Sequence, residues 1–181
     1  WGRPTLVNNV ETFANVPWIL RNGPARFAAI GNNTCNGTKV FSLAGKVRHG
    51  GLIEIPLGLT IRDVVEVIGG GVREGKRFKA VQIGGPSGGC IPEHKMNIPT
   101  DYEELKKLGA IMGSGGMVVM DEGTCMVDLA KFFMEFIQAE SCGKCIPCRE
   151  GTRHMLDILT NITEGKGQPG DIELLEKMSV L

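Results

Sequence analysis

The sequence predicts an α+β fold in which a mixed β-sheet wrapped around one helix precedes a small helical bundle. Residues 38–83 alternate apolar and polar side chains in three segments that enclose one helical pattern, in the order β-β-α-β. A β-grasp arrangement is a compact solution for that order. Residues 126–181 instead repeat apolar side chains with helical spacing. We therefore expect a helical linker at 1–37, a β-grasp domain at 38–120 and a helical domain at 121–181.

The composition excludes several classes of function. The 181 residues have a formal net charge of zero, so no basic field would attract nucleic acid. No run approaches the roughly 18 apolar residues that a membrane span needs, so we expect no direct membrane insertion. Nothing near Trp1 reads as a signal peptide. The chain begins without methionine and stops at Leu181 inside a helical pattern, so we expect a piece of a longer polypeptide.

The predicted linker is helical between residues 9 and 30. Asn8 or Asn9 is placed to cap a helix whose apolar residues follow in "VETFANVPWIL". Pro17 is expected to kink or end that helix, and Pro24 to begin a second turn. The turn cluster "GNNTCNG" then marks the boundary with the sheet.

A hairpin followed by a capped helix is expected to begin the β-grasp domain. "KVFSLAGKV" places Phe41, Leu43 and Val47 on one face, and "LIEIPL" alternates again after the turn "RHGG". Thr60 precedes "IRDVVEVI", whose apolar residues recur at i, i+3, i+4 and i+7. Asp63 at the third helical position resembles a capping box, and three consecutive glycines end the helix.

Two glycine-rich segments superficially suggest phosphate binding. The strand Phe78–Ile83 leads into Ile83–Gly89, which is not a P-loop because no lysine follows it. We interpret it as a tight loop, with a backbone pressed against a ligand as the alternative. "GKGQPG", residues 165–170, formally matches a dinucleotide motif but follows a helical pattern, so we interpret it as an inter-helix loop. The short helix "DYEELKKLGAI" and the strand Gly116–Met120 complete the domain.

Three amphipathic stripes predict the helical bundle. The first runs from Met126 to Ile137 and the second from Met155 to Ile162. A third begins at Leu174 and includes Leu181. We interpret these stripes as packing surfaces rather than cofactor contacts.

Three cysteines in "ESCGKCIPCREGT" form the strongest chemical signal. The spacing of Cys142, Cys145 and Cys148 lets three thiolates of one loop converge on a single point, and Gly143 permits the backbone this needs. Runs of this kind hold iron–sulfur clusters, with a fourth ligand from elsewhere. The motif enters a helix at Arg149, and the positive end of the helix dipole suits an anionic cluster. The sequence therefore predicts an iron–sulfur site.

Other cysteine chemistries remain open at this stage. Zinc bound by three cysteines and a histidine would need His154, which on a continuous helix points well away from Cys148. Disulfides would also involve the isolated Cys35, Cys90 and Cys125. The chain is too long to need such staples and has no secretory signal, so we expect free thiols.

Two segments resemble a known family. "PTLVNNVETFANVPWIL" and "ESCGKCIPCREGT" resemble the NADH-binding flavoprotein subunit of respiratory complex I and NAD(P)-linked hydrogenases, and the resemblance covers residues 2–181. It implies a flavin and nicotinamide domain, mostly missing here, followed by a β-grasp domain of the soluble-ligand-binding (SLBB) type. A helical domain with one [4Fe–4S] cluster would come last, and Cys142, Cys145 and Cys148 match three of its ligands.

The resemblance also assigns positions outside the cysteine motif. Four residues match positions that line the flavin site of the family: Val7, Asn8, Asn9 and Thr12. The asparagine pair fits a plain helix cap equally well. The fourth cluster ligand is expected beyond Leu181, with Cys125 as the alternative.

The implied activity is that of an NAD(P)H dehydrogenase. A hydride would pass from NAD(P)H to FMN, and single electrons would then pass through the cluster to partner subunits. The implied partners are a [2Fe–2S] thioredoxin-like subunit and an iron–sulfur or hydrogenase subunit, in the bacterial cytoplasm or peripheral to a membrane complex. Because the flavin loop lies upstream of Trp1 in the family, we expect this chain alone to be inactive. The alternative is a non-redox β-grasp ligand-binding module with a structural zinc site.

Overall fold

One five-stranded mixed sheet organises the structure, a computed structural model that describes residues 2–180. Trp1 and Leu181, the outer limits of the predicted linker and helical domain, lie outside the described residues, and so does the last position of the third apolar stripe. The strand order is β2-β1-β5-β3-β4. β1 and β5 run parallel, whereas the pairs β1–β2, β3–β5 and β3–β4 are antiparallel. The strands are β1 Thr38–Gly45, β2 Gly51–Pro56, β3 Phe78–Ile83, β4 Gly89–Pro92 and β5 Gly116–Asp121.

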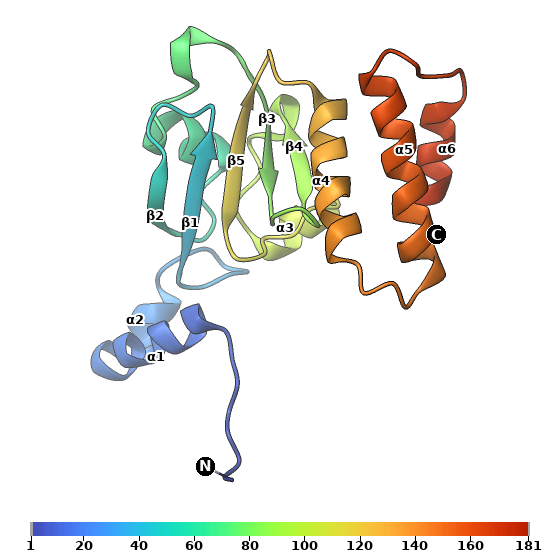
Figure 1. Ribbon diagram of the computed structural model, residues 1–181. Coiled ribbons are helices and arrows are strands. Elements are labelled where there is room, and N and C mark those ends of the chain that lie inside the picture. The colour runs from blue at the N-terminus through green and yellow to red at the C-terminus, as the bar shows by residue number, and fades with distance from the viewer. Residues whose placement is uncertain (1, 181) are drawn as a thin grey trace.

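Helices flank the sheet on several sides (Figure 1). Figure 1 shows α1 and α2 beyond one end of β1, α4 beside the sheet, and α5 and α6 on the far side of α4. None of the described helices is long and apolar enough to cross a membrane. The α-helices are α1 Val10–Asn22, α2 Pro24–Ala28, α3 Tyr102–Lys107, α4 Met126–Glu140, α5 Thr152–Thr163 and α6 Asp171–Ser179. Shorter helical turns are η1 Asp63–Ile68, η2 Arg73–Gly75, η3 Glu93–Lys95 and η4 Pro147–Gly151.

The predicted hairpin forms and contributes to the main core. Phe41, Leu43 and Val47 are all buried on one face, as the alternation in β1 predicts. β2 adds Ile55 and the segment after it adds Leu57, both buried in the same cluster. This cluster holds most of the buried apolar side chains of the described chain, so the sheet region has a core of its own.

The predicted capping box is confirmed at the start of the helical segment after the hairpin. Thr60 N and Oγ1 donate to Asp63 Oδ2 at 3.1 and 2.6 Å, and Asp63 N donates to Thr60 Oγ1 at 3.0 Å. The segment is wound more widely than the expected α-helix, because Gly69 N donates to the carbonyl of Val64 five residues earlier. It still buries Val64 and Val65 completely.

The segment after β3 contains a strand that the sequence pattern did not predict. β4 pairs with β3 along an edge of the sheet, and Ile83 pairs with Gly89, so the glycine-rich segment is a hairpin loop. A side chain at Gly88 would collide with the carbonyl oxygen of Ile83. The glycine at that position therefore permits a close approach of backbone to backbone.

Helix α1 buries none of its residues within the described chain. Its apolar Val10 and Leu20 are 82% and 80% exposed. Asn9 caps the helix, as one of the two expected caps. The expectation that the helix ends at Pro17 is wrong, since it continues to Asn22.

The helical region has a thin core. α4 packs along α5, and α5 contacts α6 across the 165–170 loop, which confirms that this segment joins two helices. Leu159 is the one buried apolar residue among those described after Asp121. The apolar stripes predicted there are thus only partly covered.

Candidate metal centre

The three clustered cysteines lie where α4 ends and the next helix begins. Cys142 and Cys145 are in the loop between α4 and η4, and Cys148 is in the first turn of η4. That turn begins at Pro147, two residues before the expected start, and continues into α5. The side chains of all three cysteines are exposed, and their thiols are free.

A small hydrogen-bond network shapes this loop. Gly143 has φ 71°, so the backbone freedom expected of it is used. Its N–H donates to Ser141 Oγ at 3.2 Å, and Arg149 Nη1 donates to its carbonyl at 2.7 Å. Ser141 Oγ lies 3.3 Å from Cys148 Sγ. The loop is therefore closed by contacts between its first and last residues.

The donor chemistry fits an iron–sulfur cluster, although the sulfurs are not gathered. Three exposed thiols follow one another on a loop that leads into a helix N-terminus, which suits an anionic cluster. Within residues 2–180, no group of three or more His, Cys, Asp or Glu side chains lies close enough to hold a metal ion. The assignment of Cys142, Cys145 and Cys148 as ligands stays a prediction.

Cys125 lies at the opposite end of α4 from the cysteine loop. It precedes the helix, which runs without interruption for 15 residues from Met126 to Glu140. At 1.5 Å per residue that helix is about 22 Å long. Cys125 is therefore too far from Cys142 to ligate the same cluster in this structure.

The predicted flavin-site residues sit where the chain enters α1. Asn9 Oδ1 accepts from Glu11 N at 3.0 Å, and Asn8 Oδ1 accepts from Asn9 N at 2.8 Å, so the helix-cap interpretation is confirmed. Val7 is 88% exposed. Asn9 and Thr12 help to line an open cavity of about 840 Å³ between α1 and the start of β1. These contacts leave a flavin role untested.

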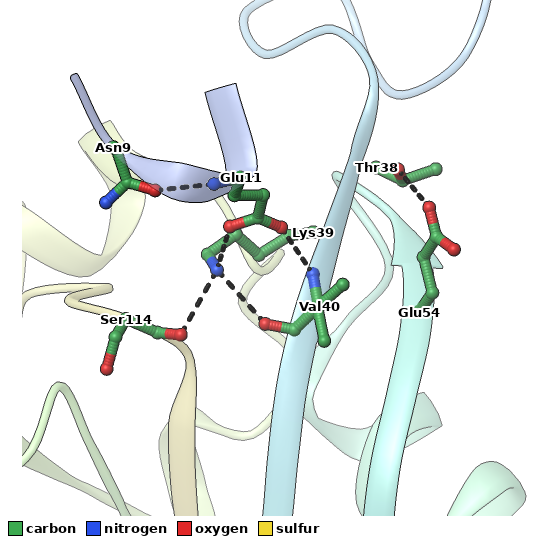
Figure 2. A network of polar contacts seen from close by, with 7 residues as sticks. All are labelled: Asn9, Glu11, Thr38, Lys39, Val40, Glu54 and Ser114. Carbon is green, nitrogen blue, oxygen red and sulfur yellow. Dashed lines mark hydrogen bonds and ion pairs between the residues drawn. The ribbon is translucent and has the colours of Figure 1, made fainter. Parts of the chain in front are cut away.

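Sequence reasoning missed an ion pair that joins α1 to the sheet (Figure 2). Lys39 Nζ lies 2.5 Å from Glu11 Oε2 and also donates to the carbonyl oxygens of Val40 and Ser114. The other carboxylate oxygen of Glu11 accepts from Val40 N at 2.8 Å. A signal was present, because Lys39 shares the inward-facing alternation of Phe41.

Comparisons with known proteins match nearly the whole chain. Residues 128–181 match the family described as the NADH-ubiquinone oxidoreductase-F iron–sulfur binding region. The NADP-reducing hydrogenase subunit HndC of Solidesulfovibrio fructosivorans is 54% identical over 99% of this chain and 36% of its own length. A subunit of the NADH-quinone oxidoreductase of Escherichia coli is 42% identical over 98% of this chain and 40% of its own length.

A solved structure agrees with these relatives. The NAD⁺-reducing [NiFe]-hydrogenase in the H₂-reduced state superposes with a TM-score of 0.83 and 34% identity, over 98% of this chain and 29% of that chain. The chain thus spans well under half the length of the relatives it matches. The resemblance seen in the two sequence segments is confirmed: residues 128–181 belong to the NADH-ubiquinone oxidoreductase-F iron–sulfur binding region, and the chain is related to part of the flavoprotein subunits of complex I and of NAD(P)-linked hydrogenases.

Proposed function

We propose that this chain is the electron-exit segment of an NAD(P)H-oxidising flavoprotein subunit. In the whole protein, a hydride from NAD(P)H would reduce FMN, and electrons would leave through a [4Fe–4S] cluster held by this chain. The cofactors supply the redox chemistry, and the chain positions them and excludes competing reactions. The receiving partners would be other subunits of a hydrogenase or complex I assembly, including a thioredoxin-like [2Fe–2S] subunit.

The observation that carries the proposal is the loop of three thiols. Cys142, Cys145 and Cys148 are free, exposed and confined to seven residues inside the matched iron–sulfur binding region. Three cysteines at this spacing are typical of cluster binding and are poor material for disulfides, because they leave an odd thiol. We assign these three side chains as the cluster ligands of this chain.

We also propose that the segment entering α1 faces the flavin. The residues concerned are Val7, Asn8, Asn9 and Thr12. Support comes from their position, since Asn9 and Thr12 border an open cavity rather than a packed core. A helix cap uses the side-chain oxygen of Asn9, and its amide nitrogen is free to donate elsewhere.

The finer description of the architecture follows from the strand order. We propose that residues 38–120 form a β-grasp domain, with 1–37 as a linker and 121–181 as a helical bundle. Parallel central strands β1 and β5, flanked by the β1–β2 and β3–β4 hairpins, support the β-grasp assignment. The packing of α4 on α5 and of α5 on α6 supports the bundle.

Metal analysis of protein purified without oxygen tests the central proposal. Iron and acid-labile sulfide should be present in equal amounts, and reduction should give the electron paramagnetic resonance signal of a [4Fe–4S] cluster. Replacing Cys145 by serine should reduce the iron content sharply, whereas Cys90→Ser, on the edge strand β4, should not. Zinc in place of iron and sulfide would overturn the proposal and favour a structural metal site.

A further inference from the structure

We propose that Ser141 is a positioning residue for the cluster and that its hydroxyl donates a hydrogen bond to Sγ of Cys148. The consequence is a higher reduction potential for the cluster than the three cysteines alone would give. This inference rests on the proposed function, because it requires Cys148 to be a ligand.

The geometry identifies the direction of the bond. Ser141 Oγ lies 3.3 Å from Cys148 Sγ, and the two residues are seven positions apart on either side of the loop. Gly143 N donates to the same Ser141 oxygen at 3.2 Å and so occupies one of its lone pairs. The hydroxyl hydrogen remains available. A cysteine that ligates iron is a thiolate without a proton, so in the holoprotein Ser141 is the donor.

Both partners of this bond are held in place by the loop. Arg149 Nη1 donates to the carbonyl of Gly143 at 2.7 Å, which fixes the turn that presents Gly143 N to Ser141. Thr152 Oγ1 contacts the carbonyl of Cys148 and lies 2.6 Å from Gln138 Oε1 on α4. Ser141 is half-buried, whereas Cys148 is exposed. The donor is therefore better protected from water than the sulfur it contacts.

The sign of the effect follows from charge. One-electron reduction makes the cluster and its sulfur ligands more negative. A hydrogen-bond donor stabilises the more negative state and therefore raises the reduction potential. Removing the Ser141 hydroxyl should shift the potential to a more negative value without removing any ligand.

Four variants of the protein, expressed with its whole natural sequence and purified anaerobically, separate this effect from loss of structure. Ser141→Val and Ser141→Thr form the central pair, because they have nearly the same shape and differ in one hydroxyl. Ser141→Ala provides the smallest deletion. Ser179→Ala, a serine in α6 that bonds to Glu176, is the control. The potential of each is measured by redox titration followed by electron paramagnetic resonance.

The expected order is a wild-type potential for Ser141→Thr and Ser179→Ala, and more negative potentials for Ser141→Val and Ser141→Ala. A Val variant with the wild-type potential and full iron content would overturn the inference. If both Val and Ala lose their iron while Thr retains it, the hydroxyl is needed to hold Cys148, which supports the positioning role. If Thr loses its iron as well, the role of the hydroxyl is refuted. Wild-type protein without iron and sulfide would instead reject the proposed function itself.

Discussion

Glu11 Oε2 lies 2.5 Å from Lys39 Nζ and joins α1 to β1 across a boundary that has almost no apolar packing. The Lys39 side chain is 4% exposed, whereas that of Glu11 is 29% exposed. Because α1 has no buried residue, this ion pair and the bond from Val40 N to the same carboxylate are the principal attachments of its first turn. The segment that we place near the flavin is thus oriented by a charge pair.

Glu11→Ala should destabilise the protein by about 3 kcal/mol, because it leaves the buried charge of Lys39 without a counter-charge. Urea unfolding measures the change. The matched control is Glu122→Ala, which breaks the exposed pair with Arg77 and should cost no more than about 1 kcal/mol. A double variant, Glu11→Ala with Lys39→Met, should recover part of the loss. Equal destabilisation by the two single alanine variants would contradict the buried-pair interpretation.

Thr60→Ala should lower the free energy of unfolding by about 1 kcal/mol, the usual cost of losing an N-cap. The hydroxyl of Thr60 both donates to Asp63 and accepts from its backbone N–H, so both halves of the capping box are disturbed. Thermal unfolding monitored by circular dichroism measures the effect. Thr163→Ala, at the exposed end of α5, serves as the control. An effect no larger than that of the control would show that the box contributes little.

Local spacing explains which features the sequence could predict. The Thr60–Asp63 box, the β1 alternation and the order of the strands depend on neighbours within a few residues, so they are readable in the sequence. Strand β4 has only four residues, with a glycine and a proline at its ends, and pairs only because the hairpin loop returns it to β3. The partner of Lys39 is 28 residues away, and no local pattern identifies it. The cysteine spacing predicts a cluster but not the arrangement of the sulfurs.

Acid should remove a specific contribution to stability at Asp101. Burial raises the pKa of this carboxyl, but hydrogen bonds from Thr34, Asn32 and the backbone N–H of Glu103 outweigh it and lower the pKa from 3.8 to about 2. A carboxyl with a lowered pKa stabilises the fold above its unfolded pKa, and that stability is lost as the pH falls through the folded pKa. The loss between about pH 5 and about pH 2 should amount to about 2 kcal/mol.

Urea unfolding at a series of pH values tests this contribution. Asp101→Asn keeps a cap oxygen for α3 but cannot titrate, so its stability should fall less steeply with acid than that of the wild type. Asp157→Asn, in α5, is the control for a carboxyl outside this network. Parallel pH profiles for wild type and Asp101→Asn would show that the hydrogen bonds from Thr34 and Asn32 do not favour the charged form.

Finally, we expect the sheet region to fold without iron, while the helical region depends on it. The sheet region has its own core, in which Val64 and Val65 are fully buried, whereas Leu159 is the one buried apolar residue described after Asp121. Helices as short as α5 and α6 are marginal in water without such packing. Metal binding would therefore contribute to the folding free energy of the helical region, as it does in small metal-dependent modules.

Hydrogen exchange on metal-free and iron-loaded protein distinguishes the two regions. Amides of Val64 and Val65 should keep the same protection in both forms. Amides of Ile158 and Leu159 should exchange much faster in the metal-free form, because the loop from Ser141 to Cys148 that joins α4 to α5 would lose its organising centre. The contact between Thr152 Oγ1 and Gln138 Oε1 opposes this effect by holding α5 to α4 directly. Equal protection of Leu159 with and without iron would mean that helix packing alone suffices and that the cluster serves electron transfer only.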